Sequence, residues 1–314
     1  MRFLDSLYNI DSFEAMASKK DFADASGVVL ARNLEFVSPK ILEQKFPALT
    51  FLQSGIMVDN AGGYASKITK RKTTVVGDTS FGGSDFGANK GKISISREED
   101  SINVYDDFKY SEWTQTDLKK AELEGINLVT EYIKGHNKIY NELIDKAGYE
   151  GVLGNDGLFN YSGFTSSGAT GSFSGLTAQE MYEEMTTLIL DQWNGVYNTD
   201  GYMANVVATS PIIINLLTKT MLNTASGTAS VMKALQDNFA GIKFVSTNKA
   251  YNGTSSVAVA FNNSEDAMSF RIPLKLEIGE IIKPSSFTYK VESMFRVAGL
   301  DVAEDGAGRK LTGL

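Results

Sequence analysis

The chain has 314 residues, of which 42% are hydrophobic and 22% are charged, so it is long enough for roughly two domains and lacks a disordered composition. The net charge of −8 argues against a dedicated nucleic-acid-binding protein, since such proteins carry basic patches. The chain has no cysteine, which excludes disulfides, thiol nucleophiles and cysteine-ligated zinc sites. Neither a signal peptide nor a transmembrane-length apolar run occurs, so we expect a protein made in the cytosol without a membrane partner.

Residues 1–27 are polar with scattered apolar positions, and we interpret them as an N-terminal arm that docks on another surface. Ser38-Pro39 predicts the start of a helix, which ends before Pro47.

A glycine-rich stretch, 77–91, lies between two segments of strand-like sequence, 64–76 and 92–110. Apolar and polar residues alternate in the second segment, which is typical of half-buried strands. The whole unit therefore predicts one long hairpin over 64–110. Because an isolated two-stranded ribbon is marginally stable in water, we expect another surface to cover it, such as a neighbouring copy of the chain.

The predicted hairpin has a basic first strand and an acidic second strand. We interpret these charges, together with three residues near the tip, as candidate contacts between subunits: Lys67, Lys70, Arg71, Lys72, Phe81, Phe86, Lys90, Glu98, Glu99 and Asp100. Asp106-Asp107 forms a second acidic cluster on the same predicted strand. Paired carboxylates also serve acid–base catalysis, but charges on an exposed ribbon are more often solvated or paired across it. Each exposed pair contributes only about 0–1 kcal/mol.

The longest helical pattern runs from Thr116 to Ala147, and Thr114 or Thr116 is placed to cap it. If it is unbroken, this helix would be about 48 Å long. Gly125 and Gly135 lie inside it and permit close packing or a bend.

A second lobe follows a Gly/Ser/Thr-rich connector at 148–175. Thr177 and Glu180 fit a capping box for a helix that reaches Trp193, and Ser210-Pro211 predicts a helix that ends near Thr220. A further helix is predicted over 231–238. Strands are predicted over 205–209, 242–246, 256–261, 267–272, 275–282 and 286–295. The chain therefore has the pattern of an α+β protein.

No pattern indicates catalytic chemistry. The single histidine, His136, lies within the predicted long helix, and no motif provides it with an orienting partner, so we favour a structural role over a general base. The segment 87–92 resembles a phosphate-binding loop, but its spacing is one residue short and Ile93 replaces the Ser or Thr that binds magnesium. We therefore predict no enzyme, no catalytic or metal-binding residue and no cofactor.

Four stretches and the order of the parts resemble one known family. The stretches are Leu34-Glu-Phe-Val-Ser-Pro-Lys-Ile-Leu-Glu-Gln-Lys-Phe-Pro-Ala-Leu, Asn205-Val-Val-Ala-Thr-Ser-Pro-Ile-Ile-Ile-Asn-Leu-Leu, 231–245 and 281–297. The chain resembles tailed-phage major capsid proteins of the Hong Kong 97-type fold, which encapsulin shells share. The resemblance covers about residues 28–311.

The resemblance implies the following organisation: an arm at 1–27, a peripheral domain at 28–63 and 111–175 with the long helix as its spine, an extended loop at 64–110, an axial domain at 176–259, and closing strands at 260–314. It implies a major capsid protein that assembles in the host cytoplasm, through pentamers and hexamers, into an icosahedral virion shell around double-stranded DNA. The wall would face DNA without sequence-specific binding. Portal, scaffold or decoration proteins are further partners, and a scaffold would be a separate protein or a removed segment.

Three alternatives stay open on the sequence alone. An encapsulin-type nanocompartment shell would contain an enzyme rather than nucleic acid. A minor virion structural protein would differ in copy number within the particle. A cytosolic enzyme with an unrecognised site would form a monomer or small oligomer, which a native mass measurement separates from capsomers or shells.

Overall fold

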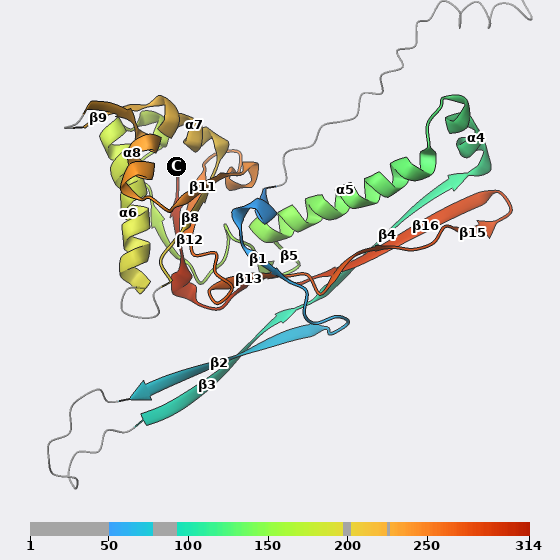
Figure 1. Cartoon of the computed structure of the whole chain (residues 1–314), viewed down its shortest axis with the longest axis horizontal. Coiled ribbons are helices and arrows are strands. Elements are labelled where there is room, and N and C mark those ends of the chain that lie inside the picture. Colours follow the sequence, from blue (N-terminus) through green and yellow to red (C-terminus); the bar gives the residue numbers. More distant parts are fainter. Residues whose placement is uncertain (1–49, 78–92, 197–201, 225–226) are drawn as a thin grey trace, which may run out of the picture. The chain divides into compact units, whose positions relative to one another are not determined.

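The structure is a computed structural model that describes residues 50–77, 93–196, 202–224 and 227–314 (Figure 1). A mixed five-stranded sheet has the strand order β11-β8-β12-β18-β7. Its members are β7 (Thr165–Gly168), β8 (Val206–Thr209), β11 (Lys243–Ser246), β12 (Val257–Phe261) and β18 (Gly308–Thr312). Strand β12 is antiparallel to both β8 and β18, whereas the pairs at the two edges, β11 with β8 and β18 with β7, are parallel.

Both faces of this sheet are buried at its central strands, β8 and β12. One face packs against three helices: α6 (Ala178–Val196), α7 (Pro211–Lys219) and α8 (Val231–Asn238). Val207, Ala258 and Ala260 point into that core, while the alternate residues Val206 and Val259 enter a second core, which includes the C-terminal end of helix α5. Burial on both sides explains why the central strands β8 and β12 are largely apolar.

A second sheet is built around the long strand β16 (Thr288–Val297). Strand β4 (Tyr105–Thr114) pairs with it along its whole length, and β14 (Leu274–Ile278) and β15 (Ile282–Ser285) also pair with it. Helix α5 (Leu128–Tyr149) runs alongside β4 and β16 (Figure 1). The ring of Tyr140 meets Phe295 edge-on at 5.0 Å, and Tyr132 stacks on Trp113 at 5.0 Å. Aromatic contacts therefore hold this helix on one face of the sheet.

Two smaller sheets contain residues of the candidate site described below. Strands β2 (Lys67–Gly77) and β3 (Ile93–Asn103) form a hairpin, and β1 (Met57–Asp59), β13 (Met268–Arg271) and β17 (Gly299–Val302) form a three-stranded sheet. The remaining short strands are β5 (Gly151–Val152), β6 (Asn155–Asp156), β9 (Met221–Thr224) and β10 (Gly227–Ser230). The short 3-10 helices are η1 (Phe51–Ser54), η2 (Phe173–Gly175), η3 (Asn248–Ala250) and η4 (Asp305–Ala307).

The long helix predicted over 116–147 is not continuous. Two helices are present, α4 (Gln115–Leu123) and α5, separated by a turn. Gly125 adopts a φ of +73° in this turn, a conformation that glycine reaches without steric cost. Asn127 then caps α5, because its side-chain oxygen accepts a hydrogen bond from the backbone N–H of Thr130 at 3.2 Å. Gly135 lies within α5 without a break.

The prediction of one hairpin strand as far as Tyr110 is also wrong. The pairing of β2 with β3 ends at Lys67 and Asn103. The next residue, Val104, lies between β3 and β4 and is buried. Strand β4 then continues in the other sheet, where Asp106 and Asp107 lie opposite β16. Both strands alternate with period two, so the pattern predicts the strands but not their partners.

The predicted helix caps are confirmed. Thr114 and Asp117 form a capping box for α4. At the start of α6, a carboxylate oxygen of Glu180 accepts from the backbone N–H of Thr177 at 2.7 Å. Ser210 caps α7, with Pro211 in the first turn. Local side-chain chemistry fixes these boundaries, which is why the sequence alone was sufficient.

The predicted arm at 1–27, the predicted helix after Ser38 and the predicted tip residues Phe81, Phe86 and Lys90 lie outside the described residues. Among the helices that are described, none combines the length and apolar character needed to cross a bilayer. The predicted domain boundaries stay predictions.

Candidate intersubunit surface

The β2–β3 hairpin has two faces of different composition. Its register runs from Lys67 opposite Asn103 to Gly77 opposite Ile93. Because side chains alternate across a strand, Lys70 and Lys72 share one face with Asp100 and Glu98, their cross-strand partners. We call this the inner face. The outer face has Lys67, Arg71, Val75, Glu99, Ile95 and Ile93.

We call the described residues outside the β2–β3 hairpin the body of the chain. Some charged side chains of the hairpin form ion pairs with this body. On the inner face, Lys70 forms an ion pair with Asp301 and donates a hydrogen bond to the carbonyl oxygen of Val302 at 3.0 Å. Lys72 forms an ion pair with Glu304. The predicted cross-strand pairing is present on the outer face, where Arg71 Nε lies 2.8 Å from Glu99 Oε1.

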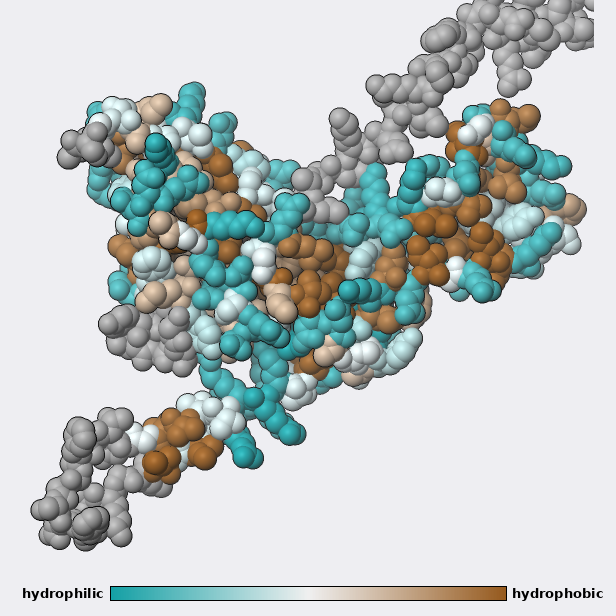
Figure 2. Space-filling view, viewed as in Figure 1, coloured by the Kyte–Doolittle hydropathy of each residue, from teal (hydrophilic) through white to brown (hydrophobic). Residues whose placement is uncertain are grey.

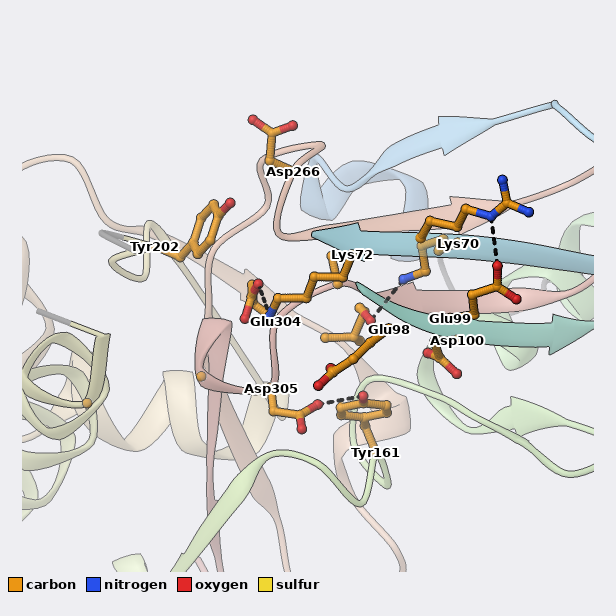
Figure 3. Close-up of a pocket in the computed structure, with 15 residues that line it drawn as sticks. Lys70, Lys72, Glu98, Glu99, Asp100, Tyr161, Tyr202, Asp266, Glu304 and Asp305 are labelled. Carbon is orange, nitrogen blue, oxygen red and sulfur yellow. Dashed lines mark hydrogen bonds and ion pairs between the residues drawn. The ribbon is translucent and has the colours of Figure 1, made fainter. Parts of the chain in front are cut away.

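A polar cavity of about 770 Å³ lies between the inner face and the body (Figure 3). The hairpin contributes Lys70, Arg71, Lys72, Glu98, Glu99 and Asp100, and the body contributes mainly Tyr161, Asp266, Glu304 and Asp305. The hydroxyl of Tyr161 donates to Asp305 Oδ1 at 2.8 Å. Burial, followed by this carboxylate, raises the pKa of Tyr161. In the described part of the chain, no group of three or more His, Asp or Glu side chains is placed to hold a metal ion.

The outer face ends in an apolar patch, and Figure 2 shows hydrophobic atoms at this end of the described hairpin. Val75 and Ile95 lie directly opposite each other and are 64% and 62% exposed, and the nearby Ile93 is 72% exposed. We call these three residues the apolar patch. Exposing three large apolar side chains at the end of a thin hairpin is unfavourable in water, so the patch is a candidate contact surface.

Arg296 on β16 holds both legs of the hairpin at its root. The side chain is 5% exposed and forms an ion pair with Asp106, which follows the hairpin in the chain. Its Nη1 also donates to the carbonyl oxygen of Gly63, which precedes the hairpin, at 2.7 Å. Nearby, Arg271 bridges Asp59 and Asp301. Sequence reasoning missed both arginines because each lies in an ordinary strand pattern and its partners are distant in the chain.

The sheet built around β16 has an aromatic face opposite helix α5. Phe108 and Tyr110 of β4 are each 66% exposed there, whereas the alternate residues Ser111 and Trp113 point toward the helix. The ammonium group of Lys290 lies 4.7 Å from the centre of the Tyr110 ring. Sequence reasoning assigned the two exposed aromatic residues to the hairpin, so this surface was not foreseen.

His136 is buried between two serines rather than placed in a polar cleft. Its Nε2 lies 2.9 Å from Ser111 Oγ on β4, and its Nδ1 lies 2.7 Å from Ser293 Oγ on β16. Burial lowers the pKa of His136. The neutral ring links α5 to two strands, which agrees with the structural role favoured from the sequence.

Comparison with known proteins identifies the fold. The family model described as "Major capsid protein" matches residues 91–314. The solved capsid of Myoviridae Phage XM1 is 41% identical, with a TM-score of 0.83, and the match covers 92% of this chain and 100% of that chain. No curated protein matches the chain.

Two more distant structures show the fold alone. The capsid of a native GTA particle is 9% identical with a TM-score of 0.67, over 94% of this chain and 99% of that one. A structure of Mycobacterium phage Ogopogo is 11% identical with a TM-score of 0.61, over 90% and 98%.

The predicted fold class is confirmed by these matches. They favour a capsid over the nanocompartment shell and over a minor virion component, and the matched proteins are structural proteins rather than enzymes. The chain therefore belongs to the major capsid protein family of tailed phages.

Proposed function

We propose that this protein forms an icosahedral shell of pentamers and hexamers, in which the apolar patch of each hairpin docks on another copy. The observation that supports this most strongly is the exposure of Val75, Ile93 and Ile95 at the end of a ribbon that pairs only with itself in the described part of the chain. Fully burying one such side chain contributes about 1.5–3 kcal/mol. Repetition over many neighbours makes the shell durable even when each contact is modest.

The aromatic face of the β16 sheet is the surface on which we place the partner's hairpin. Phe108 and Tyr110 supply exposed apolar area, and Lys290 and Glu292 beside them supply charges of both signs. The hairpin has a matching combination, because its apolar patch continues into the Arg71–Glu99 pair on the same outer face. A contact between two unlike surfaces rotates each subunit relative to its neighbour. When repeated rotations return to the first subunit, the copies form a closed ring.

The remaining partners are proposed from the net charge of the chain and from the family to which it belongs. A wall with net charge −8 does not condense on DNA, so the packaged double-stranded DNA is faced without sequence-specific binding. Portal, scaffold and decoration proteins are the further partners that a shell of this kind takes.

An assembly assay on paired variants tests this proposal. Val75→Asn with Ile95→Asn removes the apolar patch, and Thr74→Asn with Ser96→Asn changes the adjacent cross-strand pair on the inner face. Both proteins should stay folded by circular dichroism, and only the first should lose shells in sedimentation and electron microscopy. Deletion of Phe81 to Lys90 should likewise leave a soluble subunit without stable shells. Shells of normal yield from the first variant would contradict the docking role.

A further inference from the structure

We propose that Lys70 and Lys72 form an electrostatic latch, which sets the direction of the hairpin relative to its own subunit. When the two ion pairs open, the hairpin is free to change this direction. The proposal goes beyond assembly, because it concerns a single chain and is tested without a shell.

The root of the hairpin is fixed separately from the latch. Arg296 contacts the incoming leg at Gly63 and the outgoing leg at Asp106. The backbone N–H of Val104 donates to the carbonyl oxygen of Ser66 at 3.0 Å and closes the root between the two legs. Rotation of the whole hairpin about its base is therefore restricted.

Beyond the root, side chains alone fix the ribbon. In the described part of the chain, β2 and β3 pair with each other and with no other strand, so no backbone ladder joins them to the body. A two-stranded ribbon without a covering surface is only marginally stable in water. The described contacts that connect its inner face to the body include those of Lys70 with Asp301 and Val302, and of Lys72 with Glu304.

The two ion pairs differ in strength. Asp301 is 4% exposed and also contacts Arg271, so the pair nearer the root is largely shielded from solvent. The pair between Lys72 and Glu304 is more exposed, and exposed pairs are weak. The outer pair therefore opens more easily than the inner one.

Repulsion opposes the latch within the same cavity. The hairpin contributes three carboxylates, Glu98, Glu99 and Asp100, and the body contributes three more, Asp266, Glu304 and Asp305. With six carboxylates and three basic groups around it, the cavity has an excess of negative charge, so the hairpin is held only while both lysines are paired. The cavity of about 770 Å³ also leaves room for the ribbon to change direction.

A spin-label distance measurement tests the latch. The chain has no cysteine, so Thr73→Cys on the outer face and Thr187→Cys on α6 introduce one label each on the hairpin and on the body. Labelled, unassembled protein is diluted with unlabelled protein so that pulsed electron paramagnetic resonance reports distances within one chain. The unmodified latch should give a narrow distribution, and Lys70→Gln with Lys72→Gln should shift and broaden it.

A matched control removes the same charge from the opposite face. Lys67→Gln with Arg97→Gln neutralises two basic residues on the outer face of the hairpin that do not line the cavity, and should leave the distribution narrow. A rescue pair provides the second test. Lys72→Glu should broaden the distribution, and Lys72→Glu combined with Glu304→Lys should restore it. An unchanged distribution in Lys70→Gln with Lys72→Gln, equal broadening in the control, or no rescue would overturn the proposal. None of these results depends on whether the apolar patch docks on another copy.

Discussion

Arg296 and Asp106 form an ion pair between β16 and β4 at the point where the chain returns from the hairpin. The same guanidinium donates to the carbonyl oxygen of Gly63 on the other leg. One buried cation thus closes the root of the hairpin, and the hairpin is joined to the sheet that has the aromatic face. The candidate docking surface and the projection that would dock on a neighbour are therefore mechanically connected within one subunit.

Removing the Asp106 carboxylate should destabilise the protein, because Arg296 then loses its ion-pair partner. Asp106→Ala leaves Arg296 buried with one hydrogen-bond partner fewer, so we expect the free energy of unfolding to fall by about 1–3 kcal/mol in denaturant titrations. Glu112→Ala, on the same face of the same strand but exposed, should change it by at most about 0.5 kcal/mol. Equal losses in the two variants would show that the pair has no special role at the root.

His136 should make stability depend on pH in the mildly acidic range. Its folded pKa is lowered by burial, so between that pKa and the ordinary value of 6.5 the unfolded chain binds more protons. The free energy of unfolding should therefore be independent of this group above 6.5 and should fall as the pH drops below 6.5. Subtracting the profile of His136→Asn isolates this contribution from the carboxylates. A flat difference between the two proteins would contradict the buried, neutral histidine.

Two glycines of the predicted long helix should respond in opposite directions to alanine. A Cβ at either position meets no atom within 4 Å, so backbone conformation decides the outcome. Gly125 has a φ of +73°, and Gly125→Ala should lower the free energy of unfolding by about 1 kcal/mol. Gly135→Ala, inside α5, should raise it by up to about 1 kcal/mol. Stabilisation by both would mean that α4 and α5 are one continuous helix.

Gly148 should tolerate no side chain. A Cβ there would lie 2.3 Å from the ring of Phe51, which is itself packed edge-on against Tyr149 and Phe270. Gly148→Ala should therefore cost about 1–3 kcal/mol of stability by overpacking. Combining it with Phe51→Leu should cost less than the sum of the two changes. Additive losses would indicate that the ring and the helix do not touch.

Local features were predictable from the sequence, and long-range partners were not. The caps at Thr114, Thr177 and Ser210 were found because each depends on residues three positions apart or fewer. The break after α4 was missed because the apolar spacing continues through Gly125, and the change of sheet at Val104 was missed because alternation continues through it.

The candidate site was predicted only in part. Lys70 and Lys72 were selected as charged contacts, but their partners Asp301 and Glu304 lie more than two hundred residues further along the chain and leave no periodic signal. The predicted ladder across the hairpin is present at Arg71 and Glu99. The roles proposed for these residues between subunits stay predictions.

The most direct test of docking between copies is a disulfide in a chain that has none. Val75→Cys on the apolar patch is combined with Tyr110→Cys on the aromatic face, and Thr74→Cys with Tyr110→Cys serves as the control from the opposite hairpin face. Oxidised particles of the first variant should give a ladder of covalent oligomers on non-reducing gels, whereas the control should run as monomer. Intact particles that run as monomer in both, or ladders of equal intensity from both, would contradict the docking of the apolar patch on the neighbouring sheet.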